Sequence, residues 1–160
     1  LASRVIAMVN RYFDGSVPKH KHYTEADKNI QHVAAKAVAD ADAAIEKLAI
    51  HDALAAVWVL VDELNGYITV QEPWALAKDD SNRDRLATVL YTCLEGLRVL
   101  AILLAPIMPK ATNALWNAIA EISLGELEDQ PLAKAAVWGQ LHHGAAVREI
   151  EALFPRIEQE

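Results

Sequence analysis

Residues 65–78 read NGYITVQEPWALAK, a segment in which an apolar helical pattern runs into a proline followed by a tryptophan. Proline has no backbone N–H and disfavours helix at the preceding residue, so the incoming helix is predicted to end near Gln71 or Glu72. Trp74 then lies on a fixed corner. A tryptophan in that position ordinarily caps a hydrophobic core, but a rigid indole at a helix exit can also stack on a nucleic-acid base. The segment alone leaves both interpretations open.

Helical periodicity dominates the chain on both sides of this corner, and no stretch shows the sustained alternation of a half-buried strand. Helices, each with one apolar face, are predicted over residues 2–13, 24–48, 51–72, 83–104 and 109–122. Thr24 followed by Asp27 resembles a capping box with a shorter acid. Gly15 is a stop signal, and Pro109 suits the first turn of a helix. We therefore expect an all-α bundle of about five helices.

Two further tryptophans fall on apolar helical faces. Trp58 lies on that of the third predicted helix and Trp116 on that of the fifth, so both are predicted to pack inside the core. Core packing is a sufficient explanation for Trp58, Trp74 and Trp116. Only Trp74, which follows a proline, has a second interpretation.

After Gly125 the helical pattern thins, and two prolines and two glycines interrupt the scattered apolar residues of 126–160. We expect two parts, a helical bundle over residues 1–125 and a C-terminal tail over 126–160. The tail is predicted to be ordered but irregular and to pack along another surface. Trp138, followed by Gly139, is predicted to anchor it.

Length and composition are those of one well-packed domain, with 160 residues of which 53% are hydrophobic. The apolar run 97–107 is interrupted by Arg98 and is shorter than the roughly 20 residues of a membrane span, so no span is expected. Cys93 is the single cysteine, which excludes a disulfide within this chain and favours a small buried side chain. The chain begins at Leu1 without an initiator methionine or signal peptide, and is interpreted as a piece of a longer protein.

Charge is unevenly distributed along the chain. The net charge of −7 argues against a protein that coats nucleic acid by bulk attraction. Residues 1–22 nevertheless carry four Lys or Arg and one Asp, a local excess of +3. Arg11, Lys19 and Lys21 are therefore candidates for contacts to a phosphate backbone, although a solvated loop without function explains them equally well.

The sequence lacks the motifs typical of catalytic, phosphate-binding and metal-binding sites. It contains no P-loop, no dinucleotide-binding glycine motif and no nucleophile elbow. His142 and His143 are adjacent and point apart in a helix, and no His-Glu-x-x-His spacing occurs. Paired carboxylates such as Asp40 and Asp42 fall on polar helix faces. We predict neither catalytic residues nor a metal site in this chain.

Arg4 is the one cation in the first turn of the first predicted helix. A surface salt bridge is its ordinary role. If Arg4 lay beside an exposed Trp74, however, a planar cation and an indole would together form a site for one or two unstacked bases.

Several ordered landmarks match a known family. They are Asn10 to Gly15, Tyr67-Ile68, Pro73-Trp74, Leu76 to Lys78, Leu104 to Pro109, Trp116, and Leu153 to Glu158. In this order and at these separations the whole chain resembles the C-terminal helical anticodon-binding domain of bacterial methionyl-tRNA synthetase. The Pro-Trp and Leu-Phe-Pro-Arg-Ile-Glu pieces separate it from the related synthetases for Ile, Val, Leu and Cys.

The resemblance implies specific roles. In that family the tryptophan of the Pro-Trp pair stacks on an anticodon base, and the arginine of an Asn-Leu-Ala-Ser-Arg stretch contacts the same loop. These residues match Trp74 and Arg4, and the asparagine would fall just before Leu1. The resemblance also implies that the tail packs back toward the catalytic domain.

The same resemblance implies partners and a cellular role. The partners would be methionine tRNA and the catalytic domain of the same synthetase, with neither DNA nor a membrane, in the cytoplasm. The HIGH and KMSKS signatures are absent, so this fragment is expected to be inactive and to use no cofactor itself. ATP and methionine would be used by the missing catalytic domain of this methionine-tRNA ligase.

Two other classes of function stay open. A helical protein–protein interaction module would show no anticodon preference and no clustering of Arg4 with Trp74. A small helical enzyme would need a pocket of converging ionisable groups. An exposed Trp74 at the same end of the bundle as the first helical turn would favour tRNA binding.

Overall fold

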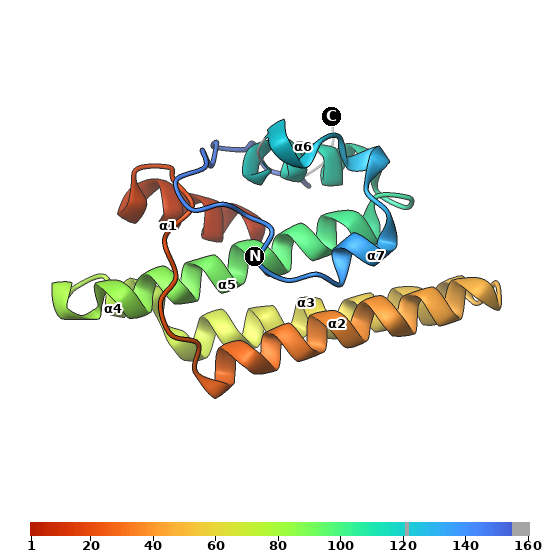
Figure 1. Ribbon diagram of the computed structural model, residues 1–160, viewed down its shortest axis with the longest axis horizontal. Coiled ribbons are helices and arrows are strands. Elements are labelled where there is room, and N and C mark those ends of the chain that lie inside the picture. Colours follow the sequence, from red (N-terminus) through yellow and green to blue (C-terminus); the bar gives the residue numbers. More distant parts are fainter. Residues whose placement is uncertain (121, 155–160) are drawn as a thin grey trace, which may run out of the picture.

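The computed structural model describes residues 1–120 and 122–154, and its regular structure there is helical (Figure 1). The α-helices are α1 (Ala2–Phe13), α2 (Glu25–Glu46), α3 (Ile50–Gln71), α4 (Pro73–Leu76), α5 (Arg83–Leu104), α6 (Pro109–Ile119) and α7 (Leu132–Ala135). Short 3-10 turns are η1 (Asp80–Asn82), η2 (Ile122–Leu124) and η3 (Leu127–Asp129). Five of the described helices have 11 or more residues. The predicted all-α bundle of about five helices is confirmed.

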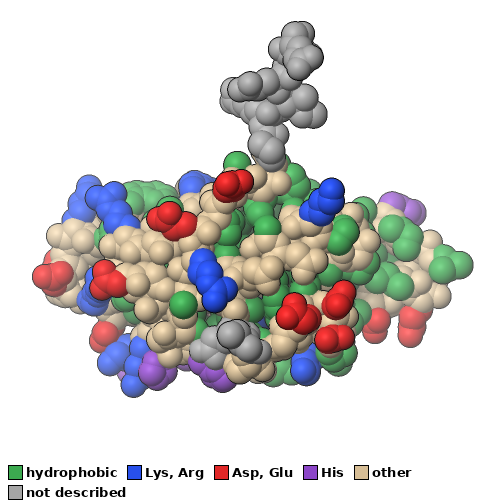
Figure 2. Space-filling view, turned by 90° about the horizontal axis from the view of Figure 1, so that it is seen from above, with side chains coloured by type: hydrophobic (Ala, Val, Ile, Leu, Met, Phe, Trp, Pro, Cys, Tyr) green, Lys and Arg blue, Asp and Glu red, His purple; other side chains and the backbone are tan. Residues whose placement is uncertain are grey.

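The bundle has α5 at its centre (Figure 1). The antiparallel hairpin of α2 and α3 packs on one side of α5, and α1 and α6 pack on the other. α4 lies at one end of the molecule, and the turn between α2 and α3 lies at the opposite end. That turn exposes the apolar side chains of Ile45, Leu48 and Ile50, whereas charged side chains gather at the α4 end (Figure 2). The two ends therefore differ in character.

Burial extends around the whole circumference of α5 over residues 86–104. The prediction of a single apolar face is wrong for this helix, because packed elements cover it from both sides. Polar side chains such as Glu95 and Arg98 are therefore enclosed as well. Two segments, Ile50–Leu76 and Asp80–Leu104, are long and apolar enough to cross a membrane by length and composition alone. In the most apolar 18-residue stretch of each, 33% and 100% of the residues are buried inside the domain. The hydrophobicity of the second is accounted for by its place in the core.

Helix ends follow the local signals. α3 ends at Gln71, as predicted, because Glu72 takes a left-handed φ of 44° and Pro73 begins α4. α2 begins after Thr24, and the predicted capping box is present. The carboxylate of Asp27 accepts hydrogen bonds from the backbone N–H of Thr24 at 2.6 Å and from its hydroxyl at 2.9 Å.

The two tryptophans predicted to be buried have different outcomes. Trp116 is buried, and its indole N–H donates to the carbonyl of Gly125 at 3.0 Å. Trp58 is 49% exposed, so its predicted core position is wrong. The buried row of α3 runs through Val57, Leu60 and neighbours at helical spacing. Trp58 lies one residue past that row, about 100° around the helix.

The described part of the tail packs on the bundle itself. Gly139 and Leu141 donate backbone N–H groups to the carboxylate of Glu95 on α5, at 3.0 and 2.7 Å. Further on, residues 144–147 pair with residues 15–17 of the loop after α1 through backbone hydrogen bonds. Trp138 is partly buried against the core. Within the described residues of the tail, α7 and η3 are the regular pieces.

Candidate nucleic-acid interface

Trp74 projects from a short, well-defined corner. Pro73 is buried, whereas the Trp74 side chain is 40% exposed. The amide N–H of Ala75 donates to the carbonyl of Glu72 at 2.7 Å, and that of Ala77 donates to the carbonyl of Pro73 at 3.0 Å. The indole is therefore held on an ordered turn with part of its surface open to solvent, as a base-stacking residue requires.

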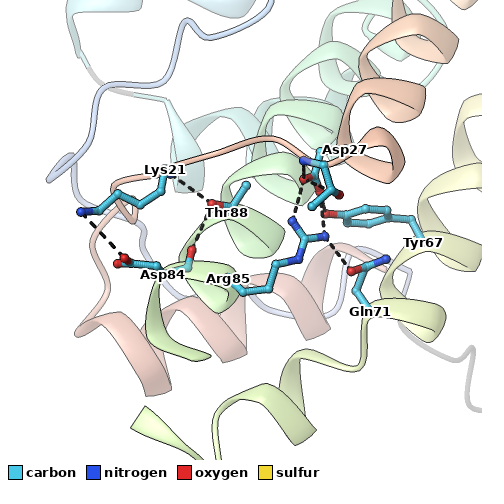
Figure 3. Close-up of polar contacts among 8 residues, drawn as sticks. Lys21, Asp27, Tyr67, Gln71, Asp84, Arg85 and Thr88 are labelled. Carbon is cyan, nitrogen blue, oxygen red and sulfur yellow. Dashed lines mark hydrogen bonds and ion pairs between the residues drawn. The ribbon is translucent and has the colours of Figure 1, made fainter. Parts of the chain in front are cut away.

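A partly buried polar cluster lies at the end of α3, next to this corner in the sequence (Figure 3). Asp27 of α2 is fully buried. The guanidinium of Arg85 on α5 donates two hydrogen bonds to its carboxylate, at 2.6 and 3.0 Å. Tyr67 of α3 donates its hydroxyl to the same carboxylate. Arg85 also donates to the side-chain oxygen of Gln71, the last residue of α3, at 2.6 Å. The cluster therefore ties α2, α3 and α5 together beside α4.

Hydrogen bonding decides the charge states in this cluster. Burial by itself raises the pKa of the Asp27 carboxyl, but bonds from Arg85, Tyr67 and Thr24 outweigh it and hold that pKa below its ordinary value. Burial and the bond to Asp27 both raise the pKa of the Tyr67 phenol. Burial lowers the pKa of Arg85, but the hydrogen bond and charge of Asp27 together with Tyr67 outweigh it and raise that pKa. At neutral pH the cluster is a charged Asp–Arg pair with a neutral tyrosine.

Arg4 is exposed and lies in the first turn of α1. The C-terminal end of α1 lies beside the start of α5, because the guanidinium of Arg83 lies 4.2 Å from the ring centroid of Phe13. At the other end of α1, Leu1, Ala2 and Ser3 line a groove with Leu97 and Leu100 of α5. Arg4 and Phe13 are nine positions apart, or about 14 Å along the axis of α1. The first turn of α1 lies near the middle of the molecule's length, whereas α4 lies at one end (Figure 1).

The predicted basic residues have mixed surroundings. Arg11 is exposed and lies 5.6 Å from the centroid of the Tyr12 ring. Lys19 is exposed, and the ammonium of Lys21 lies 3.9 Å from a carboxylate oxygen of Asp84. Figure 2 shows Lys and Arg side chains interspersed with Asp and Glu at this end of the molecule. The surface there is mixed in charge, which favours local contacts over bulk attraction of nucleic acid.

Sequence reasoning missed Arg83, Arg85 and Gln71 as contributors to this region. Arg85 and Asp27 are 58 residues apart, and no local pattern pairs them. The capping-box acid at Asp27 was the available signal, but a box normally sits at the surface, whereas this carboxylate is buried. A hydrogen-bond partner from another helix was therefore invisible in the sequence.

Comparisons with known proteins agree with one another. A family profile described as the anticodon binding domain of methionyl tRNA ligase matches residues 17–160. The methionine–tRNA ligase of Streptomyces coelicolor is 49% identical, over 99% of this chain and 30% of that protein. The one from Caldanaerobacter subterraneus is 38% identical, over 100% of this chain and 24% of that protein. The chain therefore spans about a third or less of these relatives.

A solved structure gives the same result. Apo methionyl-tRNA synthetase from Mycobacterium tuberculosis superposes with a TM-score of 0.86 at 29% identity. The match covers 99% of this chain and 31% of that protein. A second structure of that synthetase, bound by methionyl-adenylate, also has a TM-score of 0.86 over 96% of this chain.

Proposed function

Because the chain belongs to the family of anticodon-binding domains of methionyl-tRNA ligases, we propose that it recognises the anticodon loop of methionine tRNA. The observation that carries the proposal is the indole of Trp74, 40% exposed on an ordered corner at one end of the bundle. Unstacked bases of an RNA loop are recognised by stacking on aromatic rings and by hydrogen bonds to their edges. Trp74 is the residue that we assign to stacking.

Arg4 is assigned to a second point on the same loop. A planar guanidinium can donate two parallel hydrogen bonds to a base edge or a phosphate. Arg11, Lys19 and Lys21 are assigned to backbone contacts, which position the loop without reading its sequence.

The chemistry of the longer enzyme is proposed to lie outside this chain. The relatives are methionine–tRNA ligases, and this chain corresponds to 24 to 30% of them. We propose that ATP and methionine are used by a catalytic domain in the remaining part and that this ligase works in the cytoplasm. The present chain would supply tRNA selection to it.

The division into bundle and tail is also proposed to have a role. Leu153 and Phe154 near the end of the tail line a groove of about 330 Å³ together with Leu1. The end of the described tail and the start of the chain therefore lie side by side. This supports the proposal that residues beyond the bundle, over 126–160, pack back toward the catalytic domain. The landmark residues Pro155 to Glu158 lie outside the described part of the chain.

A titration tests the proposed function. Labelled RNA stem-loops with the methionine anticodon or a near-cognate anticodon are titrated against the chain at a stated salt concentration, since phosphate contacts depend on salt. Tighter binding of the methionine stem-loop is expected. Equal affinity for both stem-loops would contradict anticodon recognition and favour the protein–protein interaction module instead.

A further inference from the structure

The corner that carries Trp74 is short. α4 contains four residues, and its N-cap Glu72 has a φ of 44° in the left-handed region. A residue other than glycine adopts that conformation at a cost, and it persists only where the surrounding structure imposes it. Contacts from residues outside the corner therefore help to hold its first residues in place.

Gln71 is the last residue before the corner, and Arg85 holds it. One guanidinium nitrogen of Arg85 donates to the Gln71 side-chain oxygen at 2.6 Å and to Asp27 at 3.0 Å, and the other nitrogen donates to Asp27 at 2.6 Å. Figure 3 shows Gln71 and Asp27 on two sides of the same planar group. Asp27 is fully buried and saturated by donors, so it provides a fixed reference for Arg85.

The position of Arg85 separates it from residues that would touch RNA directly. Its side chain is 22% exposed, and the terminal nitrogens are engaged by Asp27 and Gln71. Arg83, two residues earlier, is exposed and lies over the Phe13 ring instead. Any influence of Arg85 on RNA binding therefore passes through the end of α3.

We infer that Arg85 is a positioning residue for Trp74, which it preorganises by clamping Gln71 at the entrance to the α4 corner. This inference rests on the proposed function of Trp74. An indole that is already oriented loses less side-chain freedom on binding than a mobile one. Releasing the clamp should therefore weaken stem-loop binding by about two- to tenfold, the cost of immobilising one side chain.

A double-mutant cycle tests the inference with the full chain and a labelled methionine anticodon stem-loop. Gln71→Met removes the acceptor but keeps the ion pair between Arg85 and Asp27, so it separates positioning from stability. Arg85→Lys keeps the charge but cannot span both acceptors with a planar fork. Each variant is measured alone and with Trp74→Ala, at a temperature where far-UV circular dichroism shows every variant folded. Arg83→Met is the matched control.

The expected result is a two- to tenfold loss for Gln71→Met and Arg85→Lys that disappears when Trp74 is already alanine. A loss of the same size in the Trp74→Ala background would overturn the inference, and so would wild-type affinity for both variants. Arg83→Met should change binding equally in both backgrounds. Failure of the proposed function looks different, because Trp74→Ala alone would then bind as tightly as the wild type.

Discussion

Glu95 and Arg98 form an ion pair one turn apart on α5, with Arg98 Nε 3.0 Å from a Glu95 oxygen and side chains only 0% and 2% exposed. Both side chains also form hydrogen bonds to the backbone of the tail. Arg98 donates to the carbonyl of Val137 at 2.6 Å, and Glu95 accepts from Gly139 and Leu141. The pair therefore anchors the tail to the centre of the bundle.

Breaking this pair should destabilise the whole domain. Arg98→Met leaves the Glu95 carboxylate buried without its cation, and the free energy of unfolding should fall by about 3 to 5 kcal/mol. Urea unfolding followed by circular dichroism measures this. Lys36→Met is the control, because Lys36 and Asp40 form an exposed pair whose loss should cost about 0.5 kcal/mol. Similar losses for both variants would contradict the assigned role of the buried pair.

Trp74→Ala should weaken binding of the methionine anticodon stem-loop by about 10- to 100-fold, because stacking contributes about 1 to 3 kcal/mol per base. Helix content should not change, since the indole is partly exposed. Fluorescence anisotropy with labelled RNA gives the affinity. Trp58→Ala removes another exposed tryptophan, on α3 and away from the α4 corner, and should leave affinity unchanged. Unchanged affinity for Trp74→Ala would exclude stacking.

Arg4→Ala should weaken the same binding by about tenfold, the cost of a charged hydrogen bond. Because Arg4 and Trp74 are assigned to different points on the loop, the effect of Arg4→Ala should add to that of Trp74→Ala within about 0.5 kcal/mol. The double variant measures this directly. Strong coupling between the two substitutions would show that both residues hold one base. Arg4→Lys should restore only part of the affinity, since it lacks the planar fork.

Acid should weaken the domain through Asp27. Its folded-state pKa is lowered, so its stabilising effect is complete above the unfolded value of about 3.9 and is lost as the pH falls through the folded pKa. Urea unfolding between pH 7 and pH 2 tests this. Asp27→Asn should be less stable at pH 7 and should lose less stability on acidification. Parallel curves for the variant and the wild type would contradict the assignment.

The stability of the domain should also depend on pH through His20, at a pH closer to neutral. Its ring stacks on Tyr91 and Tyr23, with centroids 4.2 and 4.9 Å apart. Burial lowers the pKa of His20, with His143 acting in the same direction and Glu95 opposing it. The folded state therefore disfavours the protonated ring, and stability should decline as the pH falls below about 6.5. His20→Gln should abolish that decline, as measured by urea unfolding between pH 7.5 and about 5.5.

Several features could be predicted because their causes are local. The end of α3 at Gln71 follows from Pro73, and the start of α2 follows from Thr24 and Asp27. Trp116 falls on the only apolar face of a short helix, so its burial was predictable. Trp58 was not, because α3 is apolar on several faces and periodicity alone does not choose among them.

The amino-acid sequence by itself determined the five long helices, the end of α3 at Gln71, the Pro73–Trp74 corner and the family to which the chain belongs. Only the tertiary structure decided that α5 is covered on both sides and that Arg85 joins Asp27 to Gln71. The physical reason is the range of the forces involved. Capping, proline geometry and periodicity act within a few residues, whereas burial and ion pairing depend on which distant segments pack together.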